Sequence, residues 1–111
     1  MISGPQLARM KPTAWLINTS RGGLIDNTAL KAALAAGRIG GAALDVFEPE
    51  PPDLSDLLYR DERVIVTPHA AFVSAESLHE LRLRASRQIA DALEGKRPAN
   101  VVNPEVYART T

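Results

Sequence analysis

The sequence of 111 residues contains no cysteine and no excess of either charge. The absence of cysteine excludes disulfide bonds, CxxC redox chemistry and thiolate metal sites, and it is consistent with a reducing compartment. The 13 lysines and arginines balance the 13 aspartates and glutamates. This balance argues against nucleic-acid binding, because proteins that bind nucleic acids usually carry a basic patch or stripe.

Long apolar runs are also missing. No stretch approaches the roughly 18 residues of a membrane-spanning helix, and the N-terminus lacks the apolar segment and cleavage pattern of a signal peptide. We therefore expect a cytoplasmic protein with no membrane partner. The composition is 45% hydrophobic and 23% charged, which is typical of a globular domain, or of a piece of a larger one, and too apolar for a disordered chain.

Short apolar runs recur along the chain and predict three strands, at residues 14–18, 41–47 and 64–67. The first run is continuously apolar between breakers, which is typical of a strand buried on both faces, so we expect Trp15 in the core.

Helical patterns separate these runs. They predict a short helix from Ser3, a helix from Thr28 to about Ala36, one or two turns within 54–59, and a long helix from Ser74 to Glu94. We expect Asp26 or Asn27 to cap the second helix. Further signals are an incomplete capping box at Ser74 and Ser77, and an extended tail from Val101. Strands that alternate with helices predict an α/β fold with a parallel sheet, as one domain or part of one.

Three chemically distinct side chains follow the three predicted strands. Arg21 follows the first strand, Asp45 and then Glu50 follow the second, and His69 follows the third. In open parallel sheets, ligands bind outside the carboxyl ends of the strands, so we expect these residues at one edge. Histidine is the usual general acid or base near neutral pH, a neighbouring carboxylate favours its imidazolium, and arginine binds a carboxylate through two donors.

Three segments, taken together, resemble a known family. Leu16–Asp26 (LINTSRGGLID), Ala43–Pro51 (ALDVFEPEP) and Val66–His69 (VTPH) are similar in order and spacing to the C-terminal part of the NAD-dependent D-isomer-specific 2-hydroxyacid dehydrogenases. This family includes glyoxylate/hydroxypyruvate reductases and phosphoglycerate dehydrogenases. The resemblance extends from about Ser3 to Pro104, and three ordered motifs are far more specific than one short pattern.

The resemblance implies a role for each matching residue. Arg21 would bind the substrate, Glu50, rather than the nearby Glu48, would pair with the catalytic histidine, and His69 would donate or accept the proton. Asp45 would contact the nicotinamide carboxamide. The residues implied to line the cofactor are Thr19, Ser20, Arg21, Asp45, His69, Ala70 and Ala71; no metal is implied. Phe72 and the two alanines before it are bulkier than the small residues usual after this histidine.

For a whole enzyme, the resemblance implies reversible transfer of a hydride between NAD or NADP and a 2-oxo acid or D-2-hydroxy acid. It also implies part of a Rossmann-like sheet and a homo-oligomer, usually a dimer. The Gly-x-Gly-x-x-Gly turn of the family does not occur in this sequence, and relatives are about three times longer. We therefore interpret residues 1–111 as the C-terminal part of the NAD-binding domain, with 74–111 packing toward an absent substrate domain.

Such a piece could be a truncated gene product, an engineered trimming or a proteolytic remnant, and we expect it to be inactive alone. Two alternatives follow from this interpretation. One is a folded, catalytically inactive fragment, and the other is a non-enzymatic NAD-sensing protein of the same fold, such as a transcriptional corepressor. Formate dehydrogenases share the fold but carry glutamine in place of the glutamate partner, so Glu50 argues against that activity.

Overall fold

The protein, analysed as a computed structural model, is described for residues 1–109 and divides into two units. The first unit is Met1–Ala71, and the second begins at Phe72. Within the described residues, every buried hydrophobic side chain belongs to the first unit.

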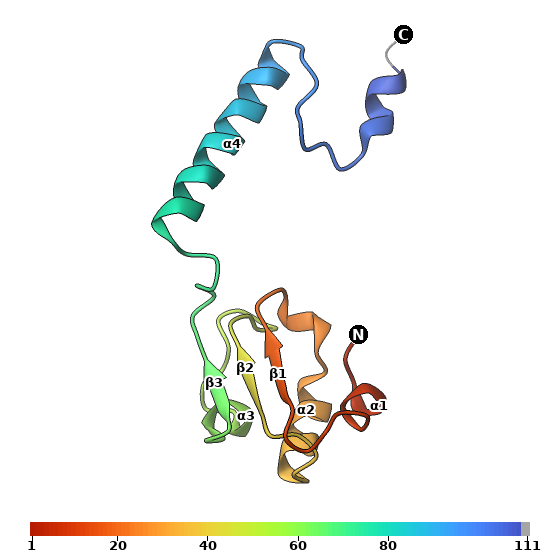
Figure 1. Cartoon of the computed structure of the whole chain (residues 1–111), viewed down its shortest axis with the longest axis vertical. Coiled ribbons are helices and arrows are strands. Elements are labelled where there is room, and N and C mark those ends of the chain that lie inside the picture. Colours follow the sequence, from red (N-terminus) through yellow and green to blue (C-terminus); the bar gives the residue numbers. More distant parts are fainter. Residues whose placement is uncertain (110–111) are drawn as a thin grey trace. The chain divides into compact units, whose positions relative to one another are not determined.

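The first unit contains a parallel sheet of three strands in sequential order (Figure 1). The strands are β1 (Trp15–Asn18), β2 (Gly41–Leu44) and β3 (Val64–Val66). In the register, Asn18 lies beside Leu44, which in turn lies beside Val66. The parallel sheet and the alternation with helices confirm the predicted α/β class. Each strand is shorter than the range predicted for it, since backbone pairing does not extend over the whole apolar run.

Three helices belong to the same unit, α1 (Gly4–Leu7), α2 (Asn27–Ala35) and α3 (Leu57–Arg60), and a short 3-10 turn, η1, covers Gly22–Leu24. The third helix begins later than predicted, because the side chain of Asp56 caps it by accepting the N–H of Leu58 at 2.8 Å.

The boundaries of α2 follow the local signals in the sequence. Oδ1 of Asp26 accepts the backbone N–H of Ala29 at 3.0 Å, which satisfies one of the free donors at the start of the helix. Gly37 follows the helix with φ +63°, a left-handed conformation that glycine adopts without a steric penalty.

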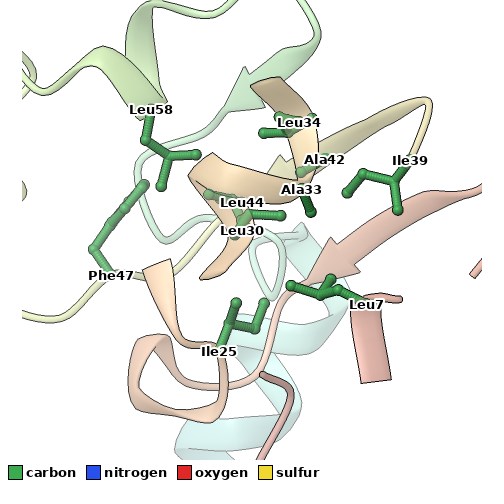
Figure 2. Packing of buried hydrophobic residues seen from close by; sticks show 10 residues of the cluster. All are labelled: Leu7, Ile25, Leu30, Ala33, Leu34, Ile39, Ala42, Leu44, Phe47 and Leu58. Atoms are coloured by element: carbon green, nitrogen blue, oxygen red, sulfur yellow. The ribbon is translucent and has the colours of Figure 1, made fainter. Parts of the chain in front are cut away.

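The core lies between α2 and one face of the sheet (Figure 2). Leu30 and Leu34 of α2 pack with Ala42 and Leu44 of β2, and all four side chains are buried. Residues from the surrounding segments complete this cluster: Leu7, Ile25, Ala33, Ile39, Phe47 and Leu58.

The expectation that β1 is buried on both faces is wrong. Trp15 is 48% exposed and Ile17 is 69% exposed, and Ile65 of β3 on the same face is 54% exposed. No helix of the first unit covers this face, so a continuously apolar strand is buried on one side only. The Trp15 ring lies over Gly41, where an added Cβ would come within 2.8 Å of it.

The second unit contains the long helix α4 (Ala75–Leu93) and a 3-10 helix, η2 (Pro104–Arg109). The capping box at Ser74 is complete, contrary to expectation, because the Ser77 hydroxyl accepts the Ser74 N–H at 2.9 Å, as a longer side chain would. The expectation of an extended tail is wrong over Pro104–Arg109, since proline suits the first position of a helix, and residues 110–111 lie outside the described residues.

No residue of α4 is buried, and its apolar side chains Leu81, Ile89 and Leu93 are all exposed. None of the helices described between residues 1 and 109 is long and apolar enough to cross a membrane. That residues 74–111 pack toward a substrate domain stays a prediction.

Replacing Leu30, which is fully buried, with alanine tests the core. We expect Leu30→Ala to lower the free energy of unfolding by about 2–5 kcal/mol, since it leaves a cavity beneath the sheet. Urea unfolding followed by circular dichroism, at one fixed protein concentration, measures the change. Leu57→Ala is the control, because Leu57 is 79% exposed, and its effect should stay within about 0.5 kcal/mol.

The uncovered face of the sheet and the free edge of β1 are the surfaces through which we expect the chain to form a homo-oligomer. Among the described strands β1 pairs only with β2, so its outer edge presents unpaired backbone groups beside Trp15 and Ile17. We expect the 111-residue chain to associate at micromolar concentration in sedimentation equilibrium, and Ile17→Lys to weaken association. A stable monomer with cooperative unfolding would contradict this prediction.

Candidate functional site

The carboxyl ends of the three strands meet at one edge of the sheet (Figure 1). The segment that follows β1 contains Arg21, the segment after β2 contains Asp45 and Glu50, and the segment after β3 contains His69. All of these segments belong to the first unit. Parallel pairing therefore gathers side chains that lie up to 48 positions apart in the sequence, the difference between positions 21 and 69.

Glu50 and His69 form the central contact of this edge. Nδ1 of His69 lies 2.9 Å from Oε2 of Glu50, and Oε1 of Glu50 accepts the backbone N–H of Phe47 at 2.9 Å. The hydrogen bond with His69 lowers the pKa of Glu50, and the Phe47 N–H and the charges of His69 and Arg21 lower it further. The carboxylate that contacts the histidine is thus the one expected from the sequence, not Glu48.

The Glu50–His69 pair remains accessible to solvent. The His69 side chain is 40% exposed and that of Glu50 is 37% exposed. A cavity of about 370 Å³ lies beside the pair, and its walls are formed by Phe47, Glu50, Pro51, Pro52, Pro68 and His69. The pair can therefore meet a small polar molecule while apolar rings limit the space around it.

His69 has a left-handed backbone with φ +52°, which is uncommon for a residue with a side chain. The segment around it is held by Asp45, which is 3% exposed. Oδ1 of Asp45 accepts the Thr67 hydroxyl and, at 2.9 Å, the N–H of Ala70, while Oδ2 accepts the N–H of Ala71 at 2.9 Å. One carboxylate therefore ties both sides of His69 to the end of β2.

These hydrogen bonds keep Asp45 ionised. The Thr67 hydroxyl is the largest influence that lowers the Asp45 pKa, and the N–H groups of Ala71 and Ala70 add to it against the opposing effect of burial. The backbone N–H groups of both alanines are thus already donated within the protein. Any cofactor contact of Ala70 or Ala71 would use the methyl group or the carbonyl oxygen.

Arg21 is exposed and lies close enough to Glu50 for its charge to lower the pKa of that carboxyl. Its Nη1 donates to the carbonyl oxygen of Ser20 at 2.7 Å. Thr19 and Ser20 are also exposed, and with residues of β1 they line a hollow of about 260 Å³. The loop that contains Arg21 therefore also supplies part of the lining of this hollow.

Gly22 brings the Arg21 loop against the segment that leads to Glu50. A Cβ at Gly22 would lie 2.0 Å from the carbonyl carbon of Phe47 and 2.5 Å from the backbone nitrogen of Glu48. No side chain fits there without moving the backbone. The close approach of Arg21 to Glu50 thus depends on this glycine.

Sequence patterns did not single out two polar residues of this edge, Asn18 and Thr67. Asn18 is buried at 6% exposure, and its side chain bonds the backbone of the Arg21 loop. The Thr67 hydroxyl bonds Asp45. A signal was present for Asn18, since an amide ends an otherwise apolar strand. Among residues 1–109, no group of three or more acidic or histidine side chains could hold a metal ion.

Replacing Asp45 with asparagine tests how far this carboxylate holds the His69 segment. Because its pKa is lowered by folding, the stabilisation is present above the usual aspartate pKa and is lost as pH falls through the lowered one. We expect Asp45→Asn to unfold at lower urea concentration at about pH 7, and to lose less stability than the unchanged chain as the pH falls from about 5 to about 2.

Glu48→Gln removes the same charge from the neighbouring loop and is the control for this measurement. Because Glu48 is exposed, this variant should unfold at close to the same urea concentration as the unchanged chain at about pH 7. Equal pH dependence in Asp45→Asn and the unchanged chain would show that Asp45 does not stabilise the fold through its charge.

Comparison with known proteins finds relatives in one family of dehydrogenases. Residues 1–71 match the family described as D-isomer specific 2-hydroxyacid dehydrogenase, NAD binding domain. A glyoxylate reductase of Korarchaeum cryptofilum is 48% identical, and the alignment covers 96% of this chain and 32% of that protein. The chain spans about a third of the length of the curated glyoxylate reductases it matches, 31–32% for the first three.

Solved structures agree with this assignment. The structure of a glyoxylate reductase from Paecilomyes thermophila superposes with a TM-score of 0.84 at 33% identity, covering 96% of this chain and 32% of that one. A D-isomer specific 2-hydroxyacid dehydrogenase from Lactobacillus delbrueckii ssp. bulgaricus, in its NAD complexed form, gives 0.78 at 34% identity over 93% of this chain and 35% of that one. The three-stranded sheet is therefore part of a Rossmann-like dinucleotide-binding fold, and the chain belongs to the D-isomer-specific 2-hydroxyacid dehydrogenase family as the C-terminal part of its NAD-binding domain.

Proposed function

We propose that this chain supplies the catalytic edge of an NAD- or NADP-dependent enzyme that interconverts a 2-oxo acid and a D-2-hydroxy acid. The observation that carries the proposal is the 2.9 Å contact between His69 and Glu50, close to the charge of Arg21. An acid–base group, its carboxylate partner and a carboxylate-binding cation are the three groups that this chemistry requires from a protein.

Arg21 binds the substrate carboxylate in this mechanism. Its planar guanidinium offers paired donors that match the two oxygens of a carboxylate, and its exposed position leaves it accessible to a small anion. Nη1 donates to the Ser20 carbonyl oxygen, and the guanidinium has further N–H donors that can bind the substrate.

His69 exchanges the proton. In this mechanism Nδ1 contacts Glu50 and Nε2 donates a proton to the carbonyl oxygen during reduction. The oxygen thereby becomes the hydroxyl of the product. In the oxidative direction the same nitrogen starts without its proton and takes the one from the hydroxyl. Glu50 holds the ring in orientation through its contact with Nδ1.

The donors and acceptors at this edge fit a nicotinamide cofactor. A carboxylate has about four lone-pair positions, and the described contacts of Asp45 use three of them, so Oδ2 retains one acceptor position for a carboxamide N–H. Thr19 and Ser20 line the hollow beside β1 and would border the same group. When bound, the cofactor supplies or accepts the hydride.

The isolated chain is inactive in this proposal. Its 111 residues contain no Gly-x-Gly-x-x-Gly turn to hold a pyrophosphate. The small 2-oxo or 2-hydroxy acid is the partner of the whole enzyme, which we propose to be a cytoplasmic homo-oligomer. Residues 74–111 would pack toward its substrate domain. A non-enzymatic NAD sensor would bind the same cofactor but would not need the Glu50–His69 pair.

A hybrid enzyme tests the proposal. This chain replaces the corresponding third of the Korarchaeum cryptofilum glyoxylate reductase, and oxidation of NADH and of NADPH is followed with glyoxylate. We expect activity from the hybrid and none from the 111-residue chain alone. His69→Ala should lower kcat by about 10²–10⁴-fold, the contribution of a general acid. Arg21→Lys should lower kcat/KM by about tenfold or more, since a charge-assisted hydrogen bond is worth about 1.5–3 kcal/mol.

His79→Ala is the matched control, because His79 is the other histidine of the chain and lies exposed on α4. Its activity should equal that of the hybrid. A His69→Ala hybrid as active as its parent would refute the proton-exchange role, and turnover by the chain alone would refute its inactivity. A hybrid that binds NADH but does not turn over would favour the sensor.

A further inference from the structure

Asn18 has a buried amide side chain at a position of β1 that faces the core. It lies on the same face of β1 as Leu16 and beside Leu44 of β2, and it is 6% exposed. Apolar residues are the rule at core-facing positions of a parallel sheet. A buried polar side chain is tolerated where its donors and acceptors are satisfied, and such departures from the local pattern occur at functional sites.

Both polar atoms of the Asn18 side chain contact the segment that contains Arg21. Nδ2 donates to the carbonyl oxygen of Arg21 at 2.8 Å, and Oδ1 accepts the backbone N–H of Ser20 at 3.1 Å. The backbone of Asn18 is itself held by β2, since its carbonyl oxygen accepts the N–H of Asp45 at 3.0 Å. One side chain therefore links the Arg21 loop to the edge that contains the other site residues.

The two ends of the Arg21 segment are thus fixed by different means. Asn18 holds the side that precedes Arg21, and the close packing of Gly22 against Phe47 holds the side that follows. The guanidinium adds a bond from Nη1 to the carbonyl oxygen of Ser20 at 2.7 Å. That carbonyl belongs to the residue whose N–H Asn18 binds, so the position of the guanidinium depends on the Asn18 side chain.

We propose that Asn18 is a positioning residue that acts through Arg21 and sets the guanidinium for the carboxylate of a 2-oxo acid. The inference rests on the proposed role of Arg21 as the carboxylate anchor. A merely structural amide would stabilise the strand end without affecting what Arg21 binds. The two possibilities therefore differ in the affinity for an anion rather than in stability alone.

The experiment uses the 111-residue chain labelled with ¹⁵N and titrated with glyoxylate. Chemical-shift changes at the Arg21 Nε–Hε group report binding, and its heteronuclear NOE without ligand reports order. Asn18→Asp keeps the size and one acceptor but places an oxygen against the Arg21 carbonyl. We expect Asn18→Asp to weaken glyoxylate binding roughly threefold to tenfold, the equivalent of one hydrogen bond, and to lower the NOE at Nε.

Leu16→Ala is the matched control, since Leu16 lies on the same strand and face and packs against the same core. It should lower stability to urea and leave both Arg21 signals unchanged. If Leu16→Ala weakens binding as much as Asn18→Asp, or if Asn18→Asp leaves affinity and NOE unchanged, the positioning role is overturned. If Asn18→Asp does not fold, Asn18→Ser, which keeps one hydroxyl, is judged by the same two signals.

Arg21→Lys separates this inference from the proposed function; because lysine has no Nε–Hε group of this kind, its binding is followed by the backbone amide shifts of the same loop. If Arg21→Lys binds glyoxylate as well as the unchanged chain, or if the unchanged chain shows no response at Arg21, the anchor role fails and the inference falls with it. If Arg21→Lys loses binding while Asn18→Asp retains it, only the role of Asn18 is refuted.

Discussion

The in-register parallel pairing of β1, β2 and β3 is the constraint on which the rest of the first unit depends. It requires a helix between β1 and β2, and α2 supplies this connection and buries Leu30 and Leu34 against the sheet. Because all three strands run in the same direction, the loops after them leave from one edge. Residues as distant in sequence as Arg21 and His69 can then share a site, although no local sequence pattern around either residue predicts the position of the other.

At that edge, the chain uses buried polar side chains where a core would otherwise be apolar. Asn18 ends β1 and bonds the Arg21 loop, and Asp45 follows β2 and bonds both sides of His69. Burial makes an unsatisfied amide or carboxylate costly, so these groups tolerate few loop conformations. Their need for hydrogen-bond partners destabilises an apolar core, but here it holds exposed, chemically active neighbours in place.

The first unit thus combines a well-organised edge with a poorly covered sheet. Trp15, Ile17 and Ile65 leave one face apolar and exposed, while Leu30, Leu34 and Leu44 are buried on the other. The chain corresponds to about a third of its curated relatives. Local hydrogen bonds organise the edge, because the Glu50–His69 contact and the bonds from Ala70 and Ala71 to Asp45 all lie within Met1–Ala71.

The sequence by itself indicated the α/β class, a helix cap at Asp26 or Asn27 and another at Ser74, because these depend on local patterns. Its resemblance to a known family indicated Glu50 as the partner of His69, because this depends on the spacing of the motifs. The sequence could not determine that β1 is covered on one face only, since a run such as Trp15–Ile17 is apolar in either case. Nor did it reveal Asn18, or the close approach of Gly22 to Phe47, as parts of the site. Only the tertiary structure decided these, because backbone hydrogen bonds and close contacts between separate loops exist only once the strands are paired.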